Sequence, residues 1–185
     1  MDSLQDDIQH LNEQLLLIAS DPDLGERTLK MLLASAPIIQ RIVAASSNAV
    51  STAIRCRIPL VTFTAALEDL AVLNPRAWRT NTAVEIPVAL QELTHFALEF
   101  AHDLVRAHPT VARMYFGLSR LAADGLGGLA LKHLLTLSRR HGVLLRLRAA
   151  DQPQLWDRLL IGERCSGPRA YRISQQMALL SLGAE

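Results

Sequence analysis

The sequence is poor in the residues that mark secreted, metal-binding and membrane proteins. Of its 185 residues only Cys56 and Cys165 are cysteines, and neither has a Cys or His nearby at zinc-finger spacing. We therefore expect neither a disulfide framework nor a zinc site. No apolar run approaches the roughly 20 residues of a membrane helix, and the N-terminus is acidic, unlike a signal peptide. These absences predict a cytoplasmic protein without membrane contact.

The chain also lacks a net charge large enough to draw it to nucleic acid or lipid. Lys and Arg number 19 and Asp and Glu 18, so any such contact must be local. Charge is unevenly placed, because the chain is acidic before Arg27 and basic between Arg139 and Arg172. The basic third predicts either solvated helix faces or contacts to nucleic acid or a partner. The candidate contact residues are Arg139, Arg140, Arg146, Arg148, Arg164, Arg169 and Arg172.

Catalytic motifs are missing as well. The glycines at 125, 127 and 128 follow a helical segment and have no Lys-Ser or Lys-Thr continuation, so they do not form a phosphate loop. Ser138 has no His and acid arrangement to activate it, and Cys56 has no evident base. We expect a protein that is not an enzyme and has no cofactor and no small-molecule substrate.

Two Glu-x-x-His units lie on one stretch, Glu92 with His95 and Glu99 with His102. In di-iron bundles such units supply metal ligands, but there they come from different helices that face one another. One helix cannot surround a metal. We therefore predict no metal and interpret these residues as a polar stripe facing a partner or second subunit, with an intermolecular metal site as the alternative.

Hydrophobic residues make up 50% of the chain and charged residues 20%, and the apolar positions recur at helical spacing over most of its length. This pattern predicts an all-α, multi-helix fold, with short extended segments at 58–63 and 143–148. Turn-forming residues around 74–82 predict a helical repeat at 1–75, a linker at 76–87 and a second repeat at 88–185 that ends in a basic helix. The apolar composition also predicts a homo-oligomer or a stable partner.

The two halves can be aligned with two single-residue gaps. Matched residues include Gln9 with Gln91, Met31 with Met114, Thr52 with Thr136, Arg55 with Arg139 and Ala65 with Ala149. Either a tandem duplication or chance agreement between Ala- and Leu-rich helices produces such a match. A duplication would place a pseudo-dimer in one chain, with one short extended segment in each half.

Residues 90 to 160 show a specific order of segments. A Leu-rich helix precedes the Met114–Leu118 stretch, a small-residue helix reaches Leu129, and a second Leu-rich helix leads to an apolar end at Leu147 and Arg148. This order resembles the FlhD family of flagellar transcription regulators, and a weaker form of the same pattern runs through residues 8 to 66. The resemblance implies a mostly helical subunit that dimerises and acts on promoter DNA together with an FlhC-like partner regulator.

The chain departs from the family at two positions. Leu145 stands where the family commonly has a cysteine for an inter-subunit disulfide, and Lys132 replaces a proline. A covalent dimer through position 145 is therefore excluded. We expect a non-enzymatic transcriptional regulator; the alternative is a cytoplasmic adaptor or chaperone-like subunit of a bacterial secretion apparatus. The candidate interface residues are Met114, Tyr115, Phe116 and Trp156, of which Trp156 is a core or interface anchor.

Overall fold

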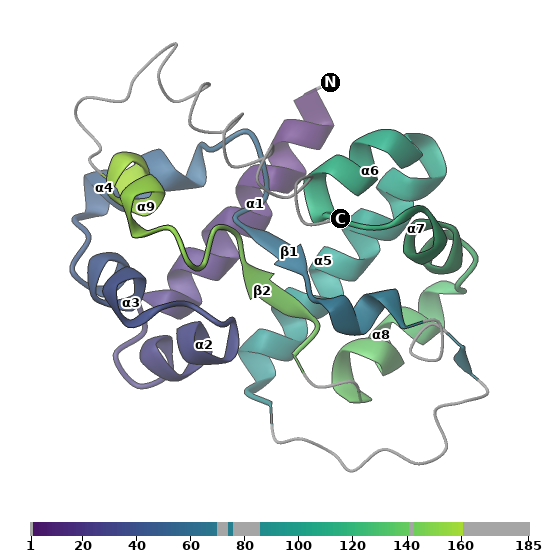
Figure 1. The fold of residues 1–185 in the computed structure, drawn as a ribbon, viewed down its shortest axis with the longest axis horizontal. Helices are drawn as coiled ribbons and strands as arrows, with labels where there is room; N and C mark the ends of the chain where they lie inside the picture. The colour runs from purple at the N-terminus through teal and green to yellow at the C-terminus, as the bar shows by residue number, and fades with distance from the viewer. Residues whose placement is uncertain (1, 70–73, 76–85, 141–142, 161–185) are drawn as a thin grey trace. The chain divides into compact units, whose positions relative to one another are not determined.

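The computed structural model describes residues 2–69, 74–75, 86–140 and 143–160, and most of them lie in helices (Figure 1). Its only sheet within this part has two strands of three residues each. The predicted all-α, multi-helix fold is confirmed. Most of the predicted linker, residues 76–85, and the predicted C-terminal helix lie outside the described residues.

The order of elements in the first half recurs in the second. In each half a long helix is followed by three short helices and a strand, and the strands stand at an offset of 84 residues (145 minus 61). The sequence alignment matches Arg55 with Arg139 at the same offset. The first series is α1 (Asp2–Ala19), α2 (Gly25–Met31), α3 (Ala36–Val43), α4 (Ser47–Ile54) and β1 (Val61–Phe63), followed by the 3₁₀ helix η1 (Ala65–Glu68). The second is α5 (Val88–Ala107), α6 (Pro109–Phe116), α7 (Arg120–Gly127), α8 (Leu131–Arg140) and β2 (Leu145–Leu147), followed by α9 (Pro153–Leu160).

Local sequence explains several helix ends. The Ser46 hydroxyl accepts a hydrogen bond from the Ala49 N–H at 3.3 Å and caps α4. The Ser119 hydroxyl does the same for α7, accepting from the Ala122 N–H at 3.1 Å. Gly117 ends α6 in the left-handed conformation, which suits a residue without a side chain.

The two strands pair antiparallel. The Arg148 N–H donates to the Leu60 carbonyl and the Thr64 N–H to the Leu144 carbonyl, both at 2.8 Å. At the 84-residue offset Leu60 matches Leu144 and Thr64 matches Arg148, so each bond is the counterpart of the other. This reciprocity is the pattern expected where two copies of one strand pair.

The described residues form two compact units that do not coincide with the predicted halves. Residues up to Val61 and from Arg146 onward form unit 1, and residues Thr62 to Leu145 form unit 2. The chain after each strand thus belongs with the helices of the other half. The physical reason is long-range packing, because α9 contacts α3 and α4, whereas η1 contacts α7.

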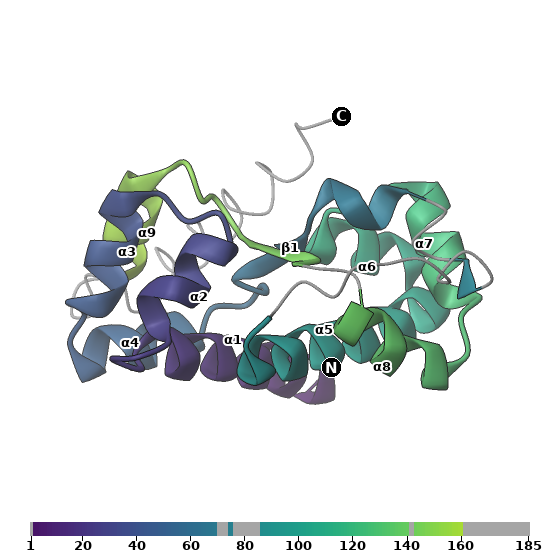
Figure 2. The ribbon, with the colours of Figure 1, turned by 90° about the horizontal axis from the view of Figure 1, so that it is seen from below.

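In unit 1, α9 covers α3 and α4 (Figure 2). Trp156 of α9 is fully buried, and Leu155 and Leu159 of the same helix are also buried. An ion pair between Arg41 of α3 and Asp157 of α9 lies at the edge of this contact. The apolar stripe of α9 therefore completes the core of unit 1.

In unit 2, α5 is the central helix, and α6, α7 and α8 all pack on it. Phe116 of α6 lies between Phe63 and Phe100, with ring centroids 5.2 and 5.4 Å away. The Glu68 carboxylate of η1 accepts a hydrogen bond from the Ser119 N–H at 2.9 Å, which fixes η1 at the start of α7. Aromatic packing and this hydrogen bond hold the end of β1 and η1 in unit 2.

Candidate functional site

Arg148, which the sequence placed among the contact residues, is buried in unit 1. Its side chain is 2% exposed, and its Nε donates a hydrogen bond to the Pro59 carbonyl at 2.8 Å. The Trp156 indole N–H donates to the Arg148 carbonyl at 3.1 Å. Burial lowers the pKa of Arg148 to about 10; the effect of Cys56 opposes this shift and that of Arg146 adds to it. The guanidinium stays charged at neutral pH but cannot reach a phosphate, so Arg148 is a structural residue.

Asn12 is a second buried polar residue of unit 1, and the sequence interpretation missed it. Its Nδ2 donates to the Ile58 carbonyl at 3.1 Å, and its Oδ1 accepts from the Leu60 N–H at 2.8 Å. The Asn12 side chain therefore makes the hydrogen bonds that a neighbouring strand would otherwise make to the backbone of the segment before β1. The available signal was an asparagine within the apolar stripe of α1, beside Leu11 and Leu15.

The predicted interface residues separate into core and surface. Phe116 and Trp156 are fully buried within units 2 and 1, respectively. They are core residues, because each large ring fills a space between helices of its own unit. Tyr115 is half-buried and Met114 is partly exposed. Of the four residues, these last two retain surface that a partner could contact.

The Glu and His residues of α5 do not act as one stripe. His95 Nε2 lies 3.4 Å from the Glu99 carboxylate on the partly exposed side of the helix. His102 is 2% exposed, and its ring nitrogens lie 3.1 Å from the Leu129 carbonyl and 3.1 Å from the Asp103 carboxylate. His102 thus ties α5 to the connection between α7 and α8. In the described part of the chain, no group of three His, Cys, Asp or Glu residues is placed to hold a metal.

The remaining predicted arginines do not form one described cluster. Arg139 is exposed on α8 in unit 2, and Arg146 is exposed on β2 in unit 1. Arg140 ends α8, and its side chain is not described. Arg164, Arg169 and Arg172 lie outside the described residues.

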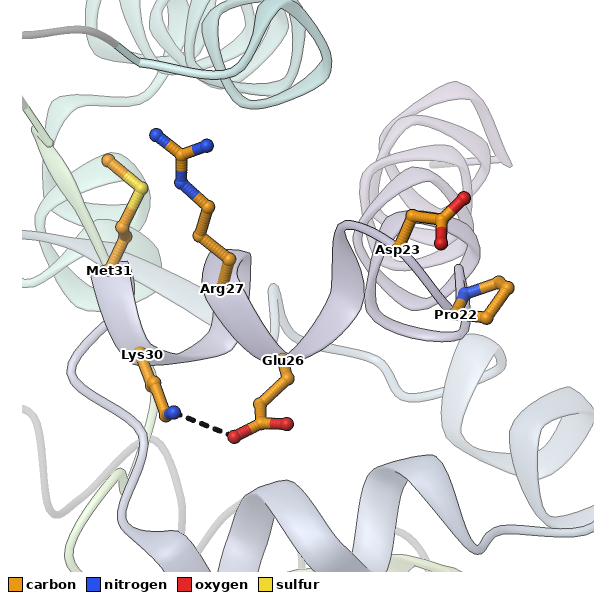
Figure 3. A pocket seen from close by; sticks show the side chains of 6 residues that line it. All are labelled: Pro22, Asp23, Glu26, Arg27, Lys30 and Met31. Atoms are coloured by element: carbon orange, nitrogen blue, oxygen red, sulfur yellow. Dashed lines mark ion pairs between the residues drawn. The ribbon is translucent and has the colours of Figure 1, made fainter.

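A shallow depression of about 560 Å³ lies beside α2 (Figure 3). Its charged groups are exposed, and Lys30 is already paired with Glu26 at 2.6 Å. A hydrogen bond from Lys30 lowers the pKa of Glu26. Figure 3 shows Arg27 on the side of α2 away from this ion pair. Because no buried polar group lines the depression, its lining offers no preorganised ligand site.

The outer face of α8 exposes two leucines. Leu131 is 57% exposed and Leu135 38% exposed, one helical turn apart. Lys132 and Arg139 are exposed on the same side, and α8 contains no acidic residue. We call Leu131, Lys132, Leu135 and Arg139 the α8 stripe. The sequence interpretation recognised Arg139 but missed the two leucines, because helical periodicity alone assigns most leucines to the core.

Comparisons with protein-family models, curated proteins and solved structures find no match to this chain. No helix among the described residues is long and apolar enough to cross a membrane.

Proposed function

We propose that this protein is a non-enzymatic transcriptional regulator of the FlhD type that acts on promoter DNA together with a protein partner. The observation that carries the proposal is the element series α5, α6, α7, α8 and β2. This is the order of segments on which the resemblance of residues 90 to 160 rests. The same series in residues 2 to 63 supports a duplicated FlhD-like repeat.

Reciprocal strand pairing supports a pseudo-dimer within one chain. FlhD-like subunits are expected to dimerise, and here the two matched hydrogen bonds at β1 and β2 occur within a single polypeptide. Leu145 is consistent with this arrangement, because a pseudo-dimer needs no inter-subunit disulfide. One chain would then take the place of two subunits.

Partner-dependent DNA binding fits the charge distribution. Arg148 is buried and the whole chain has a formal net charge of +1, so few phosphate contacts are available to the isolated protein. Few contacts imply weak binding. The partner would supply the remaining contacts with DNA.

An affinity pull-down from the native host, followed by mass spectrometry, tests this proposal. We expect an FlhC-like regulator or RNA polymerase subunits to be enriched over a control purification without the tagged chain. Enrichment of secretion-apparatus components instead would contradict the regulator and favour the adaptor.

A further inference from the structure

We propose that the α8 stripe is a docking face for an amphipathic helix of a partner protein that carries acidic residues beside its apolar side. This inference rests on the proposed function, which requires a partner, and it names the surface and the chemistry of that contact. It concerns unit 2 alone and uses exposed residues of a single helix.

The outer side of α8 exposes apolar surface. Leu134 and Leu137 on the opposite side of α8 are buried, and α8 packs on α5. Leu131 and Leu135 therefore face away from the core of unit 2. One exposed leucine is ordinary on a protein surface, but two in adjacent turns make a continuous apolar strip.

The corresponding helix of the first half, α4, has a different outer face. At the 84-residue offset the α8 stripe matches exposed residues of α4 and its C-cap, with serines in place of both leucines and an asparagine in place of the lysine. The matching residues are Ser47, Asn48, Ser51 and Arg55. A helix at this place in the repeat thus folds with a polar outer face. The leucines of α8 are not required by the repeat itself.

The charge on α8 has a single sign. Every charged side chain of α8 is basic, and no described residue forms an ion pair with Lys132 or Arg139. An apolar strip flanked by cations is complementary to a helix with an apolar strip flanked by carboxylates.

The same charge argues against a second copy of the chain. Two α8 stripes packed on one another would bring the cations of both copies together at the edges of the contact. Like charges at an interface disfavour that pairing. We therefore assign the face to a different protein.

The test uses two synthetic amphipathic peptides of roughly 20 residues, long enough to form helix. One has a leucine strip flanked by glutamates, and the other has lysines in place of the glutamates. We expect the wild-type protein to bind only the acidic peptide, and to bind it more weakly as salt rises. Fluorescence anisotropy measures both affinities.

Two double variants identify the face. L131S/L135S, which gives α8 the residues that α4 already has, is expected to weaken binding by about tenfold or more, equivalent to about 1.4 kcal/mol. K132E/R139E is expected to reverse the preference toward the basic peptide. S47A/S51A on α4 is the matched control and should bind as wild type. Circular dichroism melting establishes that each variant is folded.

Three results would overturn the docking face. They are no binding of the acidic peptide up to about 1 mM, equal binding by L131S/L135S, and concentration-dependent self-association that L131S/L135S abolishes. The last result would assign the surface to a second copy. None of them depends on the pull-down, so the docking face can fail while the proposed function stands.

Discussion

At the scale of single residues, buried polar groups matter more to this fold than the exposed charges do. Arg148 and Asn12 both satisfy backbone groups around residues 58 to 60, on the approach to β1. Each buried group that loses its partner costs about 1–3 kcal/mol. An arginine of the basic third thus stabilises the fold, although its sequence context suggested a surface contact.

Replacing Arg148 with alanine should therefore destabilise unit 1. Loss of the bond to Pro59 and the space left by the side chain should together lower the free energy of unfolding by about 3 kcal/mol. Arg139→Ala is the control, since replacing an exposed side chain should change the free energy of unfolding by less than about 0.5 kcal/mol. Urea unfolding measures both. Equal stabilities of the two variants would show that Arg148 is not structural.

Leu33 offers a second test at this scale. It has a φ of 60° and is 64% exposed, and at the 84-residue offset it matches Gly117, whose φ is 66°. A leucine in the left-handed region is strained by about 1–2 kcal/mol, whereas glycine is not. We expect Leu33→Gly to raise the melting temperature and Gly117→Ala to lower it. Calorimetry showing that Leu33→Gly is destabilising would mean that its side chain makes a stabilising contact.

At the scale of elements, α9 holds unit 1 together although it comes from the end of the described chain. Trp156 should carry most of this contact, because its side chain is fully buried and its indole N–H is bonded. Trp156→Ala should lower the free energy of unfolding by about 3–5 kcal/mol. Asp157→Asn, which removes a partly exposed ion pair, should cost about 1 kcal/mol or less. If the aspartate variant is the less stable of the two in urea unfolding, the contact is electrostatic rather than apolar.

Local elements could be predicted from the sequence. The packing of the segment after each strand on the helices of the other half could not. The order of segments predicted for residues 90 to 160 corresponds to α5, α6, α7, α8 and β2, and the predicted extended segments at 58–63 and 143–148 contain β1 and β2. Periodicity and helix-stop signals are local properties of the chain. The packing of α9 on α3 and the burial of Arg148 depend on residues more than 80 positions apart, which no local pattern specifies.

At the scale of the whole molecule, a pseudo-dimer should have no need of a second copy. The strand pairing that would join two subunits is made inside one chain, and the α8 stripe disfavours self-pairing. We expect light scattering after size exclusion to give the mass of one chain, 20.4 kDa. A stable dimer at micromolar concentration would contradict the pseudo-dimer interpretation.

The central proposal is that this chain regulates transcription through a partner. Chromatin immunoprecipitation with the tagged chain in its native host tests it most directly, with L131S/L135S as a second strain. We expect the wild-type chain to be enriched at a small set of promoters that includes flagellar genes, and the variant to lose that enrichment at equal protein level. A wild-type chain that occupies no promoter above the untagged control would contradict the account.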